Sequence, residues 1–188
     1  MAKRKVAVIV GSLRKGSFNL KMARALMKIS SPYFSTELLE IGQLPLYDQD
    51  LDEEGASTPV QWTEFRQKLK NFEAVLFVTP EYNRSIPGAL KNAIDVGSRP
   101  YGKSAWKGLP AAVVSVSPGL LGAFGANHIL RQSLVFLNMP TMPSPEAYIS
   151  SVSQLFGEDG SLTNTGTIDF MTAFMGAFAS WVDANSKK

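Results

Sequence analysis

Residues 6–19 read Val-Ala-Val-Ile-Val-Gly-Ser-Leu-Arg-Lys-Gly-Ser-Phe-Asn, and this stretch predicts the fold of the whole chain. Its first five residues are all apolar and mostly β-branched, as in a strand that is covered on both faces of a parallel sheet. The polar, glycine-containing residues that follow lead directly into a segment with helical periodicity. A buried strand, a polar loop and a helix in this order form the first unit of an α/β fold.

The same unit recurs along the rest of the chain. We predict strands at residues 6–10, 36–41, 74–79, 111–117 and 147–149, and helices at residues 19–30, 59–71, 87–98, 126–138 and 167–185. Strict alternation and right-handed crossovers favour a flavodoxin-like three-layer sandwich, in which a five-stranded parallel sheet has the strand order 2-1-3-4-5. Because no linker divides the chain, we expect one domain over residues 1–188.

Composition narrows the classes of function. The net charge of +3 comes from scattered Lys and Arg, and the clusters Lys3–Lys5 and Lys187–Lys188 are too short to predict nucleic-acid binding. No apolar run near the start approaches the roughly 20 residues of a membrane span, and we expect no targeting segment. The absence of cysteine excludes thiol nucleophiles and thiolate metal sites, and it fits a cytoplasmic protein. Any redox chemistry therefore needs a cofactor.

The loop after the first strand, residues 11–19, has the composition of an anion site. It offers the hydroxyls of Ser12 and Ser17, the guanidinium of Arg14, the amide of Asn19 and free backbone N–H groups at a helix N-terminus. A P-loop requires lysine where Ser17 stands, and a dinucleotide-binding turn requires a G-x-G that this loop lacks. A phosphomonoester fits better. The alternative is that Ser17 or Asn19 only caps the helix.

Two further loops should meet the first at the carboxyl edge of the sheet, where ligands of open α/β sheets bind. Residues 79–88 set Glu81, Tyr82 and Asn83 between two prolines, as a planar heterocycle with hydrogen-bonding edges requires. The alternative is an ordinary turn in which Asn83 or Ser85 caps the next helix. Residues 115–125 are small and glycine-rich, so that a flat ligand can approach the backbone.

With these segments in view, the chain resembles the NAD(P)H-dependent FMN reductase family, in particular its bacterial quinone reductases, also described as chromate reductases. The segments GSLRKGSFN and TPEYNRSIPGALKNAID resemble the two signature segments of that family, and SRPYGKSAWKGLP followed by SPG keeps their order. The resemblance covers nearly the whole chain.

The resemblance implies an FMN site and places its parts. The phosphate would be held by Ser12, Arg14, Ser17, Phe18 and Asn19. The isoalloxazine ring would lie against the second loop and be closed on one side by the third, through Pro80, Glu81, Tyr82, Asn83, Ser117 and Gly119. Glu81 and Tyr82 contribute mainly through their backbone in such relatives. Many relatives carry tyrosine at the position of Arg84, which we assign to substrate binding, through the phosphates of the nicotinamide or an anionic acceptor; an exposed arginine without a ligand remains the alternative.

The resemblance also implies the reaction. NADPH or NADH would reduce bound FMN and leave, and quinones, chromate, azo or nitro compounds or free flavin would then accept the electrons in the same space, which predicts ping-pong kinetics. The single histidine, His128, has no acid or nucleophile beside it in the sequence and is expected to be structural or at an interface.

The aromatic and methionine residues of the second half, at positions 101, 106, 124, 136, 139 and 142, are expected to line the acceptor cleft, a subunit contact or the core. Relatives form homodimers or homotetramers, so we expect a homo-oligomer. A flavodoxin-like electron carrier, an FMN-bound regulatory protein and, last, a phosphate-ester hydrolase are the alternatives.

Overall fold

A computed structural model describes residues 3–53 and 55–186, so that Lys187 and Lys188 lie outside the described residues. Five parallel strands form one sheet in the order β2-β1-β3-β4-β5, which confirms the predicted topology. The strands are β1 (Arg4–Val10), β2 (Phe34–Leu38), β3 (Ala74–Thr79), β4 (Ala111–Val116) and β5 (Ala147–Ile149). Since the order reverses between β1 and β3, a crevice is expected at the carboxyl ends of these two strands.

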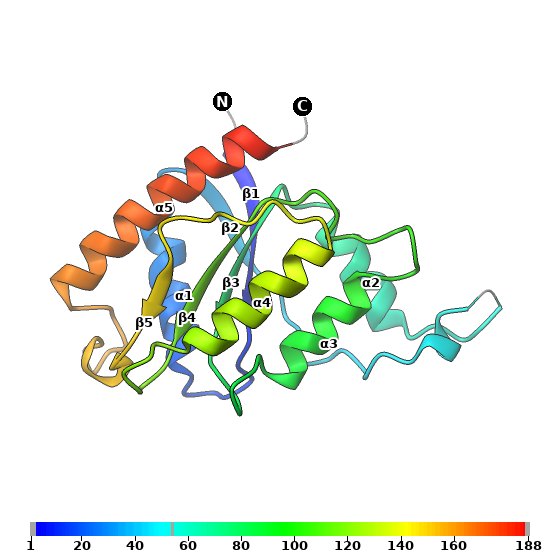
Figure 1. Ribbon diagram of the computed structural model, residues 1–188, viewed down its shortest axis with the longest axis horizontal. Helices are drawn as coiled ribbons and strands as arrows, with labels where there is room; N and C mark the ends of the chain where they lie inside the picture. Colours follow the sequence, from blue (N-terminus) through cyan, green and yellow to red (C-terminus); the bar gives the residue numbers. More distant parts are fainter. Residues whose placement is uncertain (1–2, 54, 187–188) are drawn as a thin grey trace.

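Helices cover both faces of the sheet (Figure 1). On one face lie α1 (Phe18–Ile29) and α5 (Thr165–Asn185), and on the other lie α2 (Val60–Leu69), α3 (Gly88–Gly97) and α4 (Phe124–Phe136). Alternate side chains of β1 serve the two faces: Val6, Val8 and Val10 join the core under α1 and α5, whereas Ala7 and Ile9 join the core on the other face. This double coverage is why the strand has no polar residue from position 6 to position 10.

The second strand differs from the prediction. It was expected at residues 36–41, but it begins at Phe34, which is buried and pairs with Arg4, and it ends at Leu38. The apolar residues Leu39 and Ile41 follow the strand, and their side chains are buried in the core beside α2 and α3. In the sequence, these buried apolar residues of a loop could not be distinguished from the end of a strand.

The aromatic and methionine residues at positions 101, 106, 124, 136, 139 and 142, which were expected in the acceptor cleft, a subunit contact or the core, divide between core and surface. Trp106, Met139 and Met142 are buried, and the indole Nε1–H of Trp106 donates to the carbonyl of Ile94 at 2.9 Å. In contrast, Tyr101, Phe124 and Phe136 are exposed. The role in the core is therefore confirmed only for the first three.

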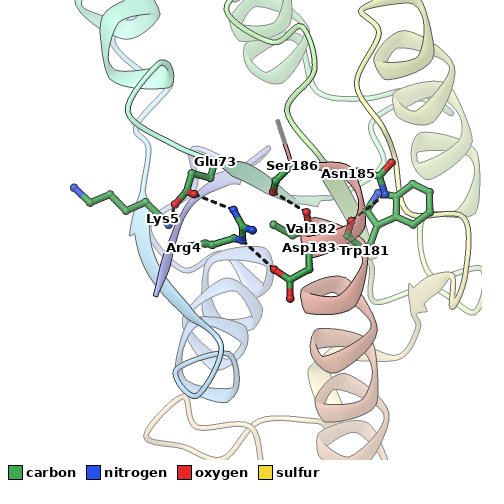
Figure 2. A network of polar contacts seen from close by, with 8 residues as sticks. All are labelled: Arg4, Lys5, Glu73, Trp181, Val182, Asp183, Asn185 and Ser186. Atoms are coloured by element: carbon green, nitrogen blue, oxygen red, sulfur yellow. Dashed lines mark hydrogen bonds and ion pairs between the residues drawn. The ribbon is translucent and has the colours of Figure 1, made fainter. Parts of the chain in front are cut away.

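Polar contacts close the amino edge of the sheet, opposite the expected crevice (Figure 2). Arg4 at the start of β1 donates to Glu73 just before β3 (3.1 Å) and to Asp183 near the end of α5 (3.0 Å). The other carboxylate oxygen of Glu73 accepts the backbone N–H of Lys5 at 2.9 Å. The hydrogen bond to Asp183, reinforced by that to Glu73, raises the pKa of Arg4. One cation therefore joins β1, β3 and α5.

None of the helices in the described ranges is long and apolar enough to cross a membrane.

Candidate functional site: three loops at the carboxyl edge

The loops after β1, β3 and β4 meet at the carboxyl edge and enclose a cavity of about 160 Å³, here called the inner cavity. Its lining comes from all three loops and from the segment after β5: Ser12, Arg14, Ser17, Phe18, Asn19, Pro80, Glu81, Tyr82, Val116, Ser117, Pro118 and Val152. A second hollow of about 400 Å³, the outer cavity, shares Arg14 and Tyr82 with the inner cavity. It continues over Gly11, Leu13 and the residues 87–89 that start α3.

The first loop presents donors to the inner cavity. Ser17 caps α1, since its Oγ accepts the backbone N–H of Leu20 at 3.3 Å, but the hydroxyl hydrogen stays available to a ligand. In the part of the chain that the structure describes, the backbone N–H groups of residues 12–16 donate to no other backbone group. Gly11 permits this path, because a Cβ there would lie 2.9 Å from the Thr79 hydroxyl oxygen. The cap at Ser17 therefore leaves donors of this loop available to an anion.

Asn19 lines the inner cavity, and its hydrogen bonds are incomplete. It is 5% exposed, its Nδ2 donates to the carbonyl of Val116 at 3.5 Å, and its Oδ1 has no partner. A buried amide oxygen without a donor costs about 1–3 kcal/mol, so such atoms are rare unless a ligand satisfies them. An oxygen that only accepts suits a ligand with hydroxyl groups next to its phosphate, as the ribityl chain of FMN has.

The second loop is a tight hairpin. Tyr82 and Ser85 exchange two backbone hydrogen bonds of 2.9 Å, and the two residues between them, Asn83 and Arg84, both have the left-handed conformation, with φ of 51° and 64°. This is the geometry of a type I′ turn. The capping alternative for this loop is wrong, because α3 begins after Pro87 without a side-chain cap. Asn83 and Arg84 form the tip and do not line the inner cavity.

The third loop is fixed by hydrogen bonds to β4 and β5. The N–H of Ser117 donates to Ile149 at 2.9 Å, and the buried hydroxyl of Ser115 donates to the carbonyl of Gly122 at 2.7 Å. At Gly122, φ is +56° and a Cβ would lie 2.6 Å from the carbonyl carbon of Tyr148, so only glycine fits. Gly119 accepts from the Ser117 hydroxyl but lies outside the inner cavity.

Nine of the predicted site residues line the inner cavity, whereas Asn83, Gly119 and Arg84 do not. The sequence-based prediction missed Val116, Pro118 and Val152. Val116 and Pro118 flank the predicted Ser117, and Val152 follows the short strand β5. All three lie after the carboxyl ends of β4 or β5 or at the end of β4, the edge at which ligands of open α/β sheets bind, and this position is the signal that could have found them.

His128 lies outside this site. Its Nε2 is 2.9 Å from the hydroxyl of Tyr148, and its ring packs on Phe124, with 4.3 Å between centroids. Burial, followed by a hydrogen bond with Glu146, raises the pKa of Tyr148 to about 12. Within residues 3–53 and 55–186, no group of three His, Cys, Asp or Glu side chains is placed to hold a metal ion.

A 2-1-3-4-5 parallel sheet with helices on both faces defines a flavodoxin-like protein, and its donor-rich loop after β1 and aromatic hairpin after β3 lie at the switch point of the strand order. Within this class, residues 4–154 match the model of the family described as NADPH-dependent FMN reductase. The chain belongs to that family. It is therefore an oxidoreductase that uses FMN as its cofactor and NAD(P)H as its electron donor.

Individual relatives cover almost the whole chain. A quinone reductase of Pseudomonas putida is 58% identical over 180 residues, which are 96% of this chain and 95% of the relative. A 2-hydroxy-1,4-benzoquinone reductase of a Burkholderia species is 40% identical over 178 residues, 95% of this chain and 96% of the relative. The solved structure of FerB, a flavoenzyme NAD(P)H:(acceptor) oxidoreductase from Paracoccus denitrificans, superposes with a TM-score of 0.90 at 41% identity, covering 98% of this chain and 100% of that one.

Proposed function

We propose that the protein reduces quinones with electrons from NAD(P)H, through FMN bound in the inner cavity. The observation that carries the proposal is the buried, unpaired Oδ1 of Asn19 beside the donor-rich loop at residues 12–17. The names of the relatives at 58% and 40% identity support quinones as the acceptor class. When bound, FMN supplies the hydride chemistry, which explains why the cavity needs no acid–base pair of its own.

The first loop is proposed to bind the phosphate. Arg14 and the hydroxyls of Ser12 and Ser17 would donate to its oxygens, together with the free backbone N–H groups of residues 12–16 and the positive end of α1. Phe18 lines the cavity and packs against Phe156, with 6.4 Å between their ring centroids, and would form one wall of the phosphate site. Asn19 would then accept a ribityl hydroxyl.

The other two loops are proposed to hold the ring. Pro80, Glu81 and Tyr82 line one side of the inner cavity, and Ser117 lines the other. Asn83 and Gly119 remain proposed contacts of the ring. Because both lie outside the inner cavity, the ring would have to extend beyond it to reach them. The outer cavity, with Tyr82 and Leu13 in its wall, is open enough for donor and acceptor to use in turn.

Arg84 is proposed to attract anionic groups of the second substrate. Its side chain is 78% exposed and donates to Glu81 through a single nitrogen, so other donors of the guanidinium face solvent. Shared use of one open space supports ping-pong kinetics and tolerance of chromate, azo and nitro compounds and free flavin.

A homo-oligomer is proposed from the surface around α4. Large apolar side chains are exposed there at Leu120, Leu121, Phe124, Val135 and Phe136. Apolar groups gathered on one helix and its preceding loop are typical of a contact surface. Size-exclusion chromatography that found only monomer would contradict this part. We place the reaction in the cytoplasm, where NAD(P)H is regenerated.

The deciding experiment follows the flavin spectrum. Purified protein that is incubated with FMN and then separated from unbound flavin should retain the absorbance of oxidised flavin, lose it on anaerobic addition of NADPH or NADH, and regain it when benzoquinone is added. Protein that gains no flavin contradicts the FMN site, and flavin that NAD(P)H leaves oxidised favours an electron carrier instead. Steady-state double-reciprocal plots should be parallel; intersecting plots contradict the shared space.

A further inference from the structure

The side chain of Glu81 links the ring-binding hairpin to a distant helix. Its carboxylate is only 13% exposed although it lies next to an exposed turn. One oxygen, Oε2, accepts the backbone N–H of Ala126 at 3.1 Å, and the other, Oε1, accepts Arg84 Nη1 at 3.0 Å. The expected backbone role of Glu81 does not account for this pair of side-chain contacts.

The contact with Ala126 replaces a missing helix cap. The residue before α4, Ala123, has no side-chain oxygen, and its φ of 60° is left-handed. Helices leave their first N–H groups unpaired unless a nearby acceptor satisfies them, and a carboxylate also interacts favourably with the positive end of the helix. Glu81 provides that acceptor from 45 residues away in the sequence.

Gly125 makes room for this contact. A Cβ at position 125 would lie 3.0 Å from Oε2 of Glu81, which is closer than carbon and oxygen normally approach. Gly125 lies in the first turn of α4, where alanine would otherwise be the better helix former. The space above this turn is therefore used by the carboxylate.

We propose that Glu81 is a positioning residue: by capping α4 and pairing with Arg84, its carboxylate holds the hairpin 81–85 in the geometry that receives the flavin ring. The two left-handed residues of the turn, Asn83 and Arg84, are enclosed by the backbone hydrogen bonds between Tyr82 and Ser85. Glu81 lies directly before this pair and attaches the turn to α4. Without the carboxylate, the hairpin keeps its own two hydrogen bonds but loses its hydrogen bond to α4. This inference rests on the proposed function, because it assigns the hairpin to the ring.

Two readouts test the proposal, one with FMN and one without. In Glu81→Ala, the dissociation constant for FMN, measured by quenching of flavin fluorescence, should rise roughly tenfold or more. In the FMN-free protein, hydrogen exchange at the Ala126 amide should become faster by a similar factor. Glu81→Gln should restore both quantities to within about threefold of the wild type, because an amide oxygen still accepts the N–H of Ala126.

Gly125→Ala provides a second route if Glu81→Ala does not fold. It should weaken FMN binding in the wild-type background, because the added methyl group displaces the Glu81 carboxylate. Where Glu81→Ala does fold, the double variant should bind FMN no more weakly than Glu81→Ala alone, because the displaced group is then absent. The matched control is Glu73→Ala at the other edge of the sheet, which removes a carboxylate bound to one backbone N–H and one arginine and should leave FMN binding unchanged.

Unchanged FMN affinity and unchanged exchange at Ala126 in Glu81→Ala would overturn the proposal, as would a Glu81→Gln variant as weak as the alanine variant in both readouts. Wild-type protein that binds no FMN would contradict the proposed function instead. The exchange measurement on FMN-free protein would still report whether Glu81 caps α4.

Discussion

Glu73 and Glu81 make the same pair of contacts at opposite edges of one sheet. Each carboxylate accepts one backbone N–H and one arginine: Lys5 and Arg4 for Glu73, Ala126 and Arg84 for Glu81. Their side chains differ in exposure, at 47% for Glu73 and 13% for Glu81. Figure 2 shows the first pair where β1, β3 and α5 come together.

The difference lies in what each carboxylate joins. Glu73 and Arg4 connect strands that already pair directly, and Arg4 reaches α5 as well. Glu81 connects a two-residue turn to a helix that has no other side-chain cap. Identical chemistry therefore contributes to stability at the amino edge, where β1 and β3 also pair through their backbones, and is proposed to set the geometry of the site at the carboxyl edge.

The largest effect should come from the carboxyl edge. Arg14→Ala removes the cation of the first loop and should weaken FMN binding roughly thirtyfold, about 2 kcal/mol, since a charge-assisted hydrogen bond to phosphate is lost. Thermal unfolding of the FMN-free protein should hardly change, because the Arg14 side chain is exposed. Fluorescence titration with FMN and calorimetry measure the two quantities. Equal losses of FMN affinity and of thermal stability would contradict the division of roles between the two edges.

Asn19→Leu should separate function from stability. The leucine removes the unpaired Oδ1, so FMN should bind about tenfold more weakly while the FMN-free protein becomes more stable by up to about 1 kcal/mol. Urea unfolding with and without FMN measures both. If the free protein is destabilised instead, the weak hydrogen bond to Val116 matters more than the unpaired oxygen.

A smaller effect is expected at the amino edge. Glu73→Ala leaves Arg4 bound only to Asp183 and should lower the free energy of unfolding by about 1 kcal/mol, which is typical of a partly exposed ion pair plus one hydrogen bond. FMN affinity should stay within error of the wild type. A change in affinity would show that the two edges are coupled through β1.

The last effect appears only in alkali and concerns Tyr148 on β5. Because the pKa of Tyr148 is raised to about 12 in the folded state, above roughly 10 for an unfolded chain, its contribution to stability is complete below pH 10 and is lost as the pH rises towards 12. Urea unfolding between pH 9 and pH 11.5 should therefore show a steeper decline for the wild type than for Tyr148→Phe. Arg4 stays protonated over this range, since its pKa is raised. Parallel pH curves for the two proteins would contradict this assignment.

Much of the fold and the site was predictable from local pattern. The uninterrupted apolar run at Val6–Val10 and the alternation of strands with helices predicted the sheet and its order, because strands that are buried on both faces carry no polar residue. The hydroxyls, guanidinium and amide of residues 12–19 predicted a site for an anion, because those groups donate hydrogen bonds to phosphate whatever their partners elsewhere.

Other features depended on contacts between distant segments. Three features could be known only from which surfaces meet. They are the start of β2 at Phe34, the burial of Trp106 in contrast to the exposure of Phe124, and the hydrogen bond between Glu81 and Ala126. Local sequence determines periodicity and the chemistry of each side chain, whereas a contact across 45 residues depends on how helices and strands pack around the shared core. The sequence by itself therefore determined the class of fold and predicted an anion loop at residues 11–19, and only the tertiary structure decided that the Glu81 carboxylate meets the Ala126 amide.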